Sequence, residues 1–137
     1  MGERVEHKRS GARFDGRVSS KQGIGYAVGD GLTVTQLTDR ATGVTINALS
    51  GTITTDSTSL AAEASAVFVV TNNKVAIGDV PVVAIRSGAV ALNTRVTVTA
   101  VAAGSFSITV VNGNVAAGTA ETGAIIINFA VIKGSTT

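Results

Sequence analysis

The chain has 137 residues, which suits a single domain, and it carries a formal net charge of +2, one histidine and no cysteine. The lack of cysteine excludes disulfide scaffolds, thiolate metal sites and thiol catalysis. Hydrophobic residues make up 45% of the chain but aromatic residues only 4%, and 16 glycines among abundant Ala, Val and Thr favour short strands joined by glycine turns.

The N-terminal part of the chain differs from the rest in charge. The first 22 residues hold six basic and three acidic residues and carry +3, whereas the other 115 residues carry −1. The first 22 residues show no sustained hydrophobic period, so they cannot form a core of their own. No apolar run follows the N-terminal charges, so we do not expect a secretory signal. Residues 23–31 contain four glycines and are predicted to be a flexible or tightly turned connector.

Alternation of apolar and polar residues predicts strands in the remainder of the chain. The predicted strands cover residues 32–37, 44–48, 49–53, 66–70, 80–85, 95–100, 105–110 and 124–132. The apolar face changes parity near Ala48, which indicates a bulge or a corner. Pro81 has no N–H group and therefore belongs at a strand start or a sheet edge. The last and longest predicted strand is apolar on both faces, so it should lie centrally in a sheet or at an interface.

These strands predict an all-β fold, a single β-sandwich domain that is jelly-roll-like, because no segment suits an amphipathic helix long enough for a parallel crossover. Residues 95–110 read as a β-hairpin around Ala103-Gly104. The predicted domains are a basic N-terminal arm and Gly-rich connector at 1–31 and the β-sandwich at 32–137. The residues expected in or near the core are Val34, Ile53, Phe68, Ile85, Val98, Phe106, Ile108, Ile127 and Phe129.

The sequence offers no set of residues for catalysis, so we predict no enzyme activity, no cofactor and no metal site. The lone histidine, His7, lies in the arm without a second ligand near it. Four acidic residues beyond the arm are scattered singly and are expected in turns or on the surface: Asp56, Glu63, Asp79 and Glu121. Two of them could still meet in space as a general acid/base pair. The glycines of the connector do not have the spacing of a dinucleotide-binding turn.

Three explanations fit the basic arm: a solvated tail, a nucleic-acid binding segment, or an anchor on a protein partner. Few aromatic residues and a modest charge density argue against nucleic acid. We therefore predict a protein partner. The residues expected to make the contact are Arg4, Lys8, Arg9, Arg13, Phe14, Arg17, Val18 and Lys21. The most apolar stretch, 124–132, is too short to cross a membrane, so no membrane partner is expected.

Several short motifs in the β region suggest a family. They are Gly23-Ile-Gly-Tyr-Ala, Thr33-Val-Thr-Gln-Leu-Thr, Thr42-Gly-Val-Thr-Ile-Asn and Asn128-Phe-Ala-Val-Ile-Lys-Gly. On these motifs the chain resembles, from about Gly23 to Gly134, the small accessory head proteins of tailed bacteriophages, which are called decoration, cement or head-fibre proteins. The resemblance implies a virion location at the capsid surface and the major capsid protein as partner.

Two further expectations concern partners. The alternatives to capsid decoration are a head fibre and a receptor- or carbohydrate-binding module, since β-sandwiches also support such sites. Sugar sites usually use exposed aromatic rings, and the chain has four Phe, one Tyr and no Trp, which favours a structural role. The two apolar faces of the last strand predict self-association, as a homotrimer or alternatively a dimer.

Overall fold

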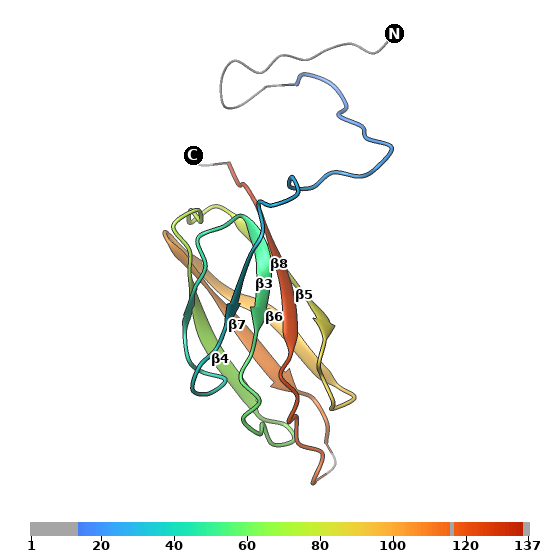
Figure 1. The fold of residues 1–137 in the computed structure, drawn as a ribbon, viewed down its shortest axis with the longest axis vertical. Coiled ribbons are helices and arrows are strands. Elements are labelled where there is room, and N and C mark those ends of the chain that lie inside the picture. Colours follow the sequence, from blue (N-terminus) through green and yellow to red (C-terminus); the bar gives the residue numbers. More distant parts are fainter. Residues whose placement is uncertain (1–13, 116, 136–137) are drawn as a thin grey trace.

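A computed structural model describes residues 14–115 and 117–135, and this part of the chain contains eight strands and no helix. The strands form two four-stranded sheets that pack face to face as a β-sandwich (Figure 1). The first sheet has the order β1 (Leu32–Thr35), β3 (Ser50–Thr54), β8 (Ile126–Ile132), β5 (Val80–Ser87). The second has the order β2 (Val44–Thr45), β4 (Ser65–Thr71), β7 (Ser105–Asn112), β6 (Thr94–Ala102). The predicted all-β sandwich is confirmed.

The core lies between the sheets and follows from the alternation of side chains along each strand. In β7, Phe106, Ile108 and Val110 point inward and are buried, while the serines and threonine between them are only half-buried. The rings of Phe106 in the second sheet and Phe129 in the first approach to 5.7 Å between centroids. Six of the nine predicted core residues are buried; Val34, Ile85 and Val98 pack against them half-buried.

Most connections pass from one sheet to the other. The chain changes sheet at six of the seven connections between the described strands, and only β6 and β7 follow each other within one sheet. As a result β1 pairs with β3, and β2 with β4, in parallel. The sequence did not predict parallel pairs because it lacks a crossover helix; here the intervening strand in the opposite sheet supplies the crossover instead.

Several local predictions are confirmed. β6 and β7 form an antiparallel hairpin that turns at Ala103-Gly104. β8 is central, with β3 on one side and β5 on the other. The parity change near Ala48 is a corner, because β2 in the second sheet ends at Thr45 and β3 in the first sheet begins at Ser50.

Pro81 lies in the edge strand β5, opposite Val131 of β8. The N–H of Val131 donates to the Leu49 carbonyl, on the side of β3 (2.7 Å). Since pairs in an antiparallel ladder alternate between bonded and non-bonded, Pro81 occupies a non-bonded position, and its nitrogen faces the open edge. The missing donor therefore costs the sheet no hydrogen bond.

Some predicted strand bounds were wrong. β1 ends at Thr35 and β2 at Thr45, both earlier than expected, because the chain leaves each sheet for the other after a few residues. β8 begins at Ile126 and has 7 residues, so β6, with 9, is longer.

Candidate functional site

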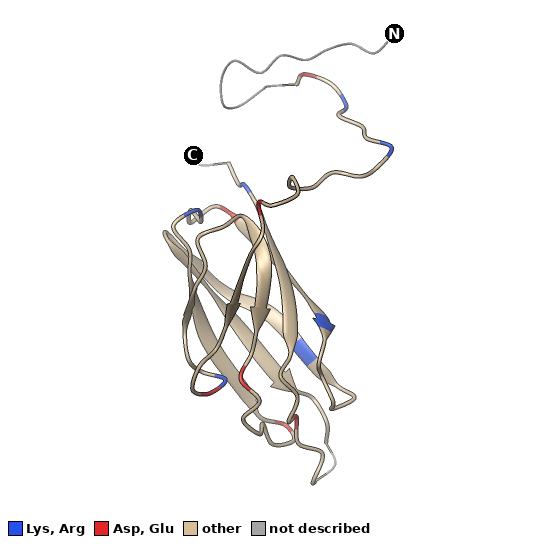
Figure 2. Cartoon of the chain, in the orientation of Figure 1, with Lys and Arg blue, Asp and Glu red and all other residues tan. Residues whose placement is uncertain are grey.

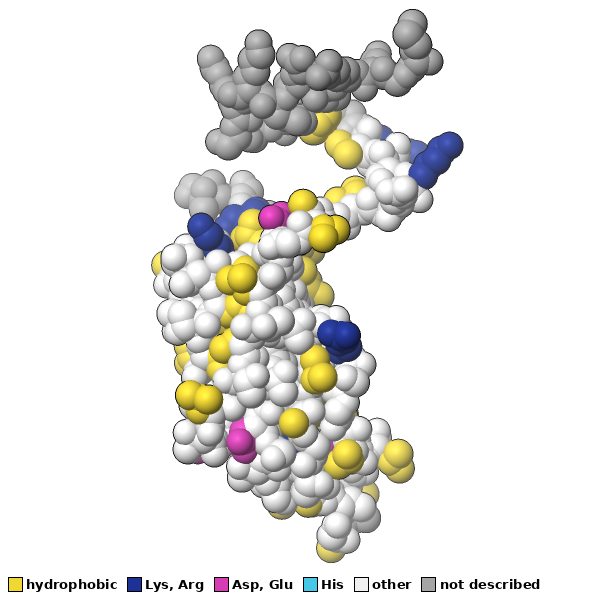
Figure 3. Space-filling model, viewed as in Figure 1, with side chains coloured by type: hydrophobic (Ala, Val, Ile, Leu, Met, Phe, Trp, Pro, Cys, Tyr) yellow, Lys and Arg dark blue, Asp and Glu magenta, His cyan; other side chains and the backbone are white. Residues whose placement is uncertain are grey.

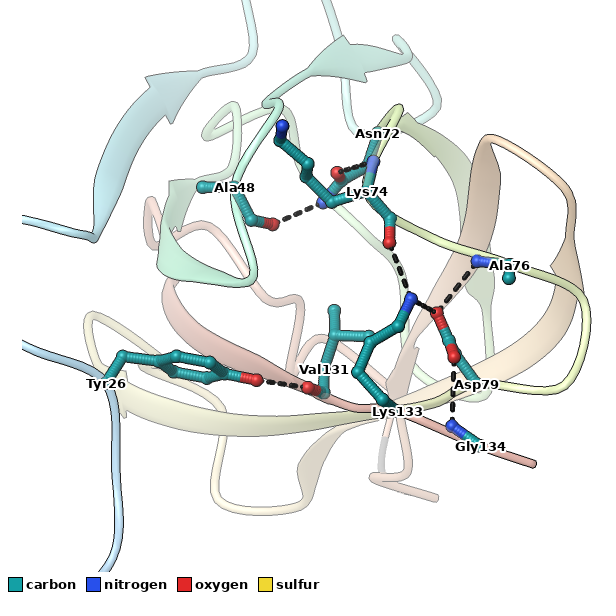
Figure 4. Close-up of polar contacts among 9 residues, drawn as sticks. All are labelled: Tyr26, Ala48, Asn72, Lys74, Ala76, Asp79, Val131, Lys133 and Gly134. Carbon is teal, nitrogen blue, oxygen red and sulfur yellow. Dashed lines mark hydrogen bonds and ion pairs between the residues drawn. The ribbon is translucent and has the colours of Figure 1, made fainter. Parts of the chain in front are cut away.

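The N-terminal segment, residues 14–31, joins the sandwich at the end where β8 finishes. We call this end the attachment end; it is formed by the corner between β2 and β3, the connection 72–79 between β4 and β5, and the last residues of β8 (Figure 4). Residues 14–31 contain no strand, and their trace leads away from the sandwich beside the C-terminal end of the described chain (Figure 1).

Tyr26 connects the segment to the sheet. Its hydroxyl donates a short hydrogen bond to the backbone carbonyl of Val131 (Figure 4). Val131 also donates its N–H to Leu49, at the point where β8 leaves β3. The tyrosine thus occupies a backbone acceptor at the end of the central strand of the first sheet.

Two grooves meet at Tyr26. The larger, of about 630 Å³, lies between the segment and the outer face of β8 and β5 and is mostly apolar. Its lining is Ile24, Gly25, Tyr26, Val82, Ala130, Val131, Ile132 and Lys133. The smaller, of about 360 Å³, includes Asp30 and Lys74 among its lining and is more polar. Tyr26 therefore lies between an apolar groove and a groove of mixed polarity.

Asp79 closes the attachment end. Its buried carboxylate accepts hydrogen bonds from the N–H groups of Ala76 (2.8 Å) and Gly134 (3.0 Å) and forms a short ion pair with Lys133. The hydrogen bond from Ala76, the one from Lys133 and the one from Gly134 lower the pKa of Asp79 to about 2. The carboxylate thereby ties the end of β8 to the connection that precedes β5.

Asn72 fixes the neighbouring corner. This fully buried side chain donates to the Ala48 carbonyl (2.6 Å) and accepts from the N–H of Lys74 (3.0 Å). Lys133 also donates to the Lys74 carbonyl (2.8 Å). The attachment end is therefore a rigid surface, built from three segments that are distant in sequence.

The opposite end, which we call the far end, is closed by Glu121. This residue is fully buried, and its carboxylate accepts from the N–H groups of Val90, Ala91 and Gly123 and from the hydroxyl of Thr94. Burial raises the pKa of Glu121, but these hydrogen bonds outweigh burial and leave the pKa below its ordinary value. Asp79 and Glu121 were expected in turns or on the surface. Asp79 ends a turn, in which its N–H donates to the Ala76 carbonyl, but both side chains are buried, because loop N–H groups compensate both carboxylates for the loss of water.

Arg40 lies beside Glu121 at the far end. It is buried and donates to the carbonyls of Thr58, Glu121 and Gly123 and to the hydroxyl of Thr55. Burial lowers the pKa of Arg40, while the charges of Glu121 and Asp56 oppose that shift. Two of the four scattered acids thus approach one guanidinium. The carboxylate of Asp56 accepts hydrogen bonds from the N–H and the hydroxyl of Thr58, and these bonds lower its pKa. The carboxylates of Asp56 and Glu121 therefore hold loops in place.

The predicted contact residues fall into two groups. Arg4, Lys8, Arg9 and Arg13 lie outside the described residues, as does His7. Phe14, Arg17, Val18 and Lys21 lie in the N-terminal segment and are all exposed. Tyr26, Asn72 and Lys133 were not predicted as site residues. Tyr26 is the only aromatic residue within the Gly-rich connector, a signal that could have identified it.

No protein-family model, curated protein or solved structure matches this chain. Within residues 14–115 and 117–135, no three His, Cys, Asp or Glu side chains are grouped so that they could hold a metal ion. The same part of the chain has no helix able to span a membrane. Any function must therefore be inferred from the chain's own residues.

Proposed function

We propose that the protein is a non-enzymatic virion structural protein of a tailed bacteriophage, which decorates or cements the capsid shell through contacts with the major capsid protein. The observation that carries this proposal is the pairing of the sandwich with an exposed N-terminal segment that carries Arg17 and Lys21 and is joined to one end of the sandwich by Tyr26. The resemblance of residues 23–134 to accessory head proteins points in the same direction. The jelly-roll-like connectivity remains a prediction.

The distribution of charge supports an arm that binds a partner. On the eight strands the only charged residues are Arg86 and Arg95, and other charges lie at the two ends and in the segment (Figure 2). Arg17 and Lys21 continue the basic sequence of residues 1–13. Each exposed ion pair contributes only about 0–1 kcal/mol, so the arm acts through several contacts, repeated over many subunits of a shell.

The apolar side chains of the segment supply a second kind of contact. Phe14 and Val18 are exposed in the segment, and further hydrophobic side chains are visible along it (Figure 3). The free energy of the complex falls when a partner covers an apolar side chain that was exposed to water. We expect Phe14 and Val18 to be buried when the arm lies on the capsid.

The outer surface of the first sheet supports self-association. Val80 and Val82 of β5 and Ile132 of β8 are exposed there, whereas the outer positions of β1 and β3 carry threonine and serine. We propose that this apolar part of the face contacts other copies of the chain, in a trimer or a dimer.

The aromatic residues favour capsid binding over carbohydrate recognition. Phe68, Phe106 and Phe129 are buried in the core, which leaves Phe14 and Tyr26 exposed, both in the N-terminal segment. The faces of the sandwich therefore offer no aromatic ring for stacking on a sugar. A head fibre or receptor-binding module would need a recognition surface of another kind.

A capsid-binding assay tests the proposal. Phage heads that lack the protein are incubated with the full chain or with a variant that lacks residues 1–22, and occupancy and heat resistance of the heads are measured. We expect the variant to remain folded but to lose most of its occupancy, and raised salt to weaken attachment of the full chain.

A charge-matched pair of variants sharpens the assay. R17Q/K21Q removes two positive charges from the segment, and R86Q/R95Q removes two from the strands; only the first should reduce occupancy. Equal occupancy of the full chain and the truncated chain would overturn the anchoring role. Absence of the chain from purified virions would overturn the proposed function itself.

A further inference from the structure

We infer that Tyr26 is a positioning residue that fixes the root of the N-terminal segment on β8, so that residues 14–22 leave the sandwich from the attachment end. The anchoring is a property of the free protein. Its consequence for capsid binding rests on the proposed function.

The exposure of neighbouring side chains identifies Tyr26 as the anchor. Ile24 and Val28 are 81% and 106% exposed, whereas Tyr26 is 42% exposed, although all three lie within five residues of each other. The apolar side chains on either side of Tyr26 are thus almost fully in water. The tyrosine has both an apolar ring between two grooves and a hydroxyl bonded to Val131.

The acceptor of this bond is well suited to an anchor. Val131 is fully buried and belongs to the central strand of the first sheet. Its position is fixed by pairing with β5 and by the hydrogen bond to Leu49, while Lys133 and Gly134, just beyond it, are held by Asp79. A segment bonded to the Val131 carbonyl is therefore bonded to one of the most constrained parts of the molecule.

The chain on the β1 side of Tyr26 turns sharply into the sheet. The N–H of Asp30 donates to the Ala27 carbonyl (3.1 Å), and Gly29 within this turn has φ of +94°. Only Gly31 then separates Asp30 from Leu32, the first residue of β1. The segment is thus held at Tyr26 and again at β1, and the turn fixes the direction in which residues upstream of Tyr26 leave.

The single tyrosine makes the anchor directly measurable. The chain has one Tyr and no Trp, so its tyrosine fluorescence comes from Tyr26 alone. In the full chain we expect acrylamide to quench this emission about half as efficiently as that of free N-acetyl-tyrosinamide. Quenching equal to that of the free compound would overturn the inference.

Amide hydrogen exchange provides the second test. Tyr26→Phe removes the hydroxyl alone, and we expect exchange of the Asp30 amide, which is hydrogen-bonded to the Ala27 carbonyl, to become about two- to tenfold faster, as for loss of one hydrogen bond. Tyr26→Ala removes the ring as well and should accelerate exchange further. Val28→Ala is the matched control at a fully exposed position and should leave the rates unchanged. Core amides of β7 should exchange alike in all variants, which shows that the sandwich remains folded.

The outcomes separate the two proposals. Faster exchange in Tyr26→Phe supports the anchor whatever the capsid assay gives, and unchanged exchange overturns it. If the anchor holds and the full chain binds capsids, Tyr26→Phe should also bind them more weakly. Failure of the full chain to bind capsids contradicts the proposed function and leaves the anchor standing.

Discussion

The two ends of the sandwich are both closed by a buried carboxylate, but the surroundings of the two carboxylates differ. At each end, β5 and β8 are tied together by a buried carboxylate that accepts backbone N–H groups: Asp79 at the attachment end and Glu121 at the far end. A glycine contact lies beside each carboxylate. A Cβ atom on Gly134 would stand 1.7 Å from the Gly78 carbonyl oxygen, and one on Gly123 would stand 1.8 Å from that of Gly88.

The ends differ in what surrounds the carboxylate. Glu121 is enclosed by loops and the buried Arg40, whereas Asp79 is paired with Lys133, whose side chain is half-exposed. The Glu121 carboxylate is therefore sealed inside the far end, whereas Asp79 is paired with a side chain that solvent can reach. This difference teaches that a buried carboxylate can hold a loop either from a closed interior or from just below the surface.

The largest effect is expected at Glu121. Replacing Glu121 with Ala leaves three backbone N–H groups and the Thr94 hydroxyl without their buried acceptor, which should lower the free energy of unfolding by about 4 kcal/mol. Glu121→Gln keeps the shape and one acceptor oxygen and should cost less. Urea denaturation measures both, and a loss below about 1 kcal/mol in Glu121→Ala would contradict the sealed far end.

The glycine contact beside Glu121 should give the next largest effect. Gly88 has φ of +89°, and a Cβ atom there would lie 2.0 Å from the Ala124 carbonyl oxygen. Gly88→Ala should therefore cost about 3 kcal/mol, from backbone strain and a collision together. Gly104→Ala is the matched control, because Gly104 also has positive φ but nothing lies within 4 Å of its added Cβ. That variant should lose only about 1 kcal/mol in the same denaturation experiment.

The smallest effect is expected at Asp79 and concerns how the stability of the protein depends on pH. Its pKa is lowered from 3.8 to about 2 in the folded protein, so the native state favours the ionised form. Its contribution to stability is present above about pH 4 and is lost as the pH falls to about 2. The difference in melting temperature between the wild type and Asp79→Asn should shrink over this interval. A difference that stays constant from pH 6 to pH 2 would show that the charge of Asp79 is not what holds this end.

Local patterns were predictable from the sequence, and contacts between distant segments were not. The β6–β7 hairpin follows from strict alternation around one glycine turn, and β8 could be placed centrally because Ile127 and Phe129 share the strand with further apolar residues on the other face. The parallel pairing of β1 with β3 and of β2 with β4 arises because the strand between them lies in the opposite sheet. The alternation of apolar and polar residues along one strand does not show to which sheet that strand belongs. Asp79 and Glu121 resemble surface acids in sequence, since a donor such as Gly134 lies 55 residues from Asp79.

The alternation of strands between the sheets also governs how the chain can fold. Apart from the β6–β7 hairpin, every strand pair joins segments separated by another strand, so loop closure must precede most of the stabilising contacts, and folding should be slow for a domain of this size. β8 lies between β3 and β5 in the first sheet. During synthesis on the ribosome, β3 and β5 therefore have no shared partner until β8 has emerged. We expect its arrival to join both strands in one step, and we expect their apolar faces to be prone to aggregation until then.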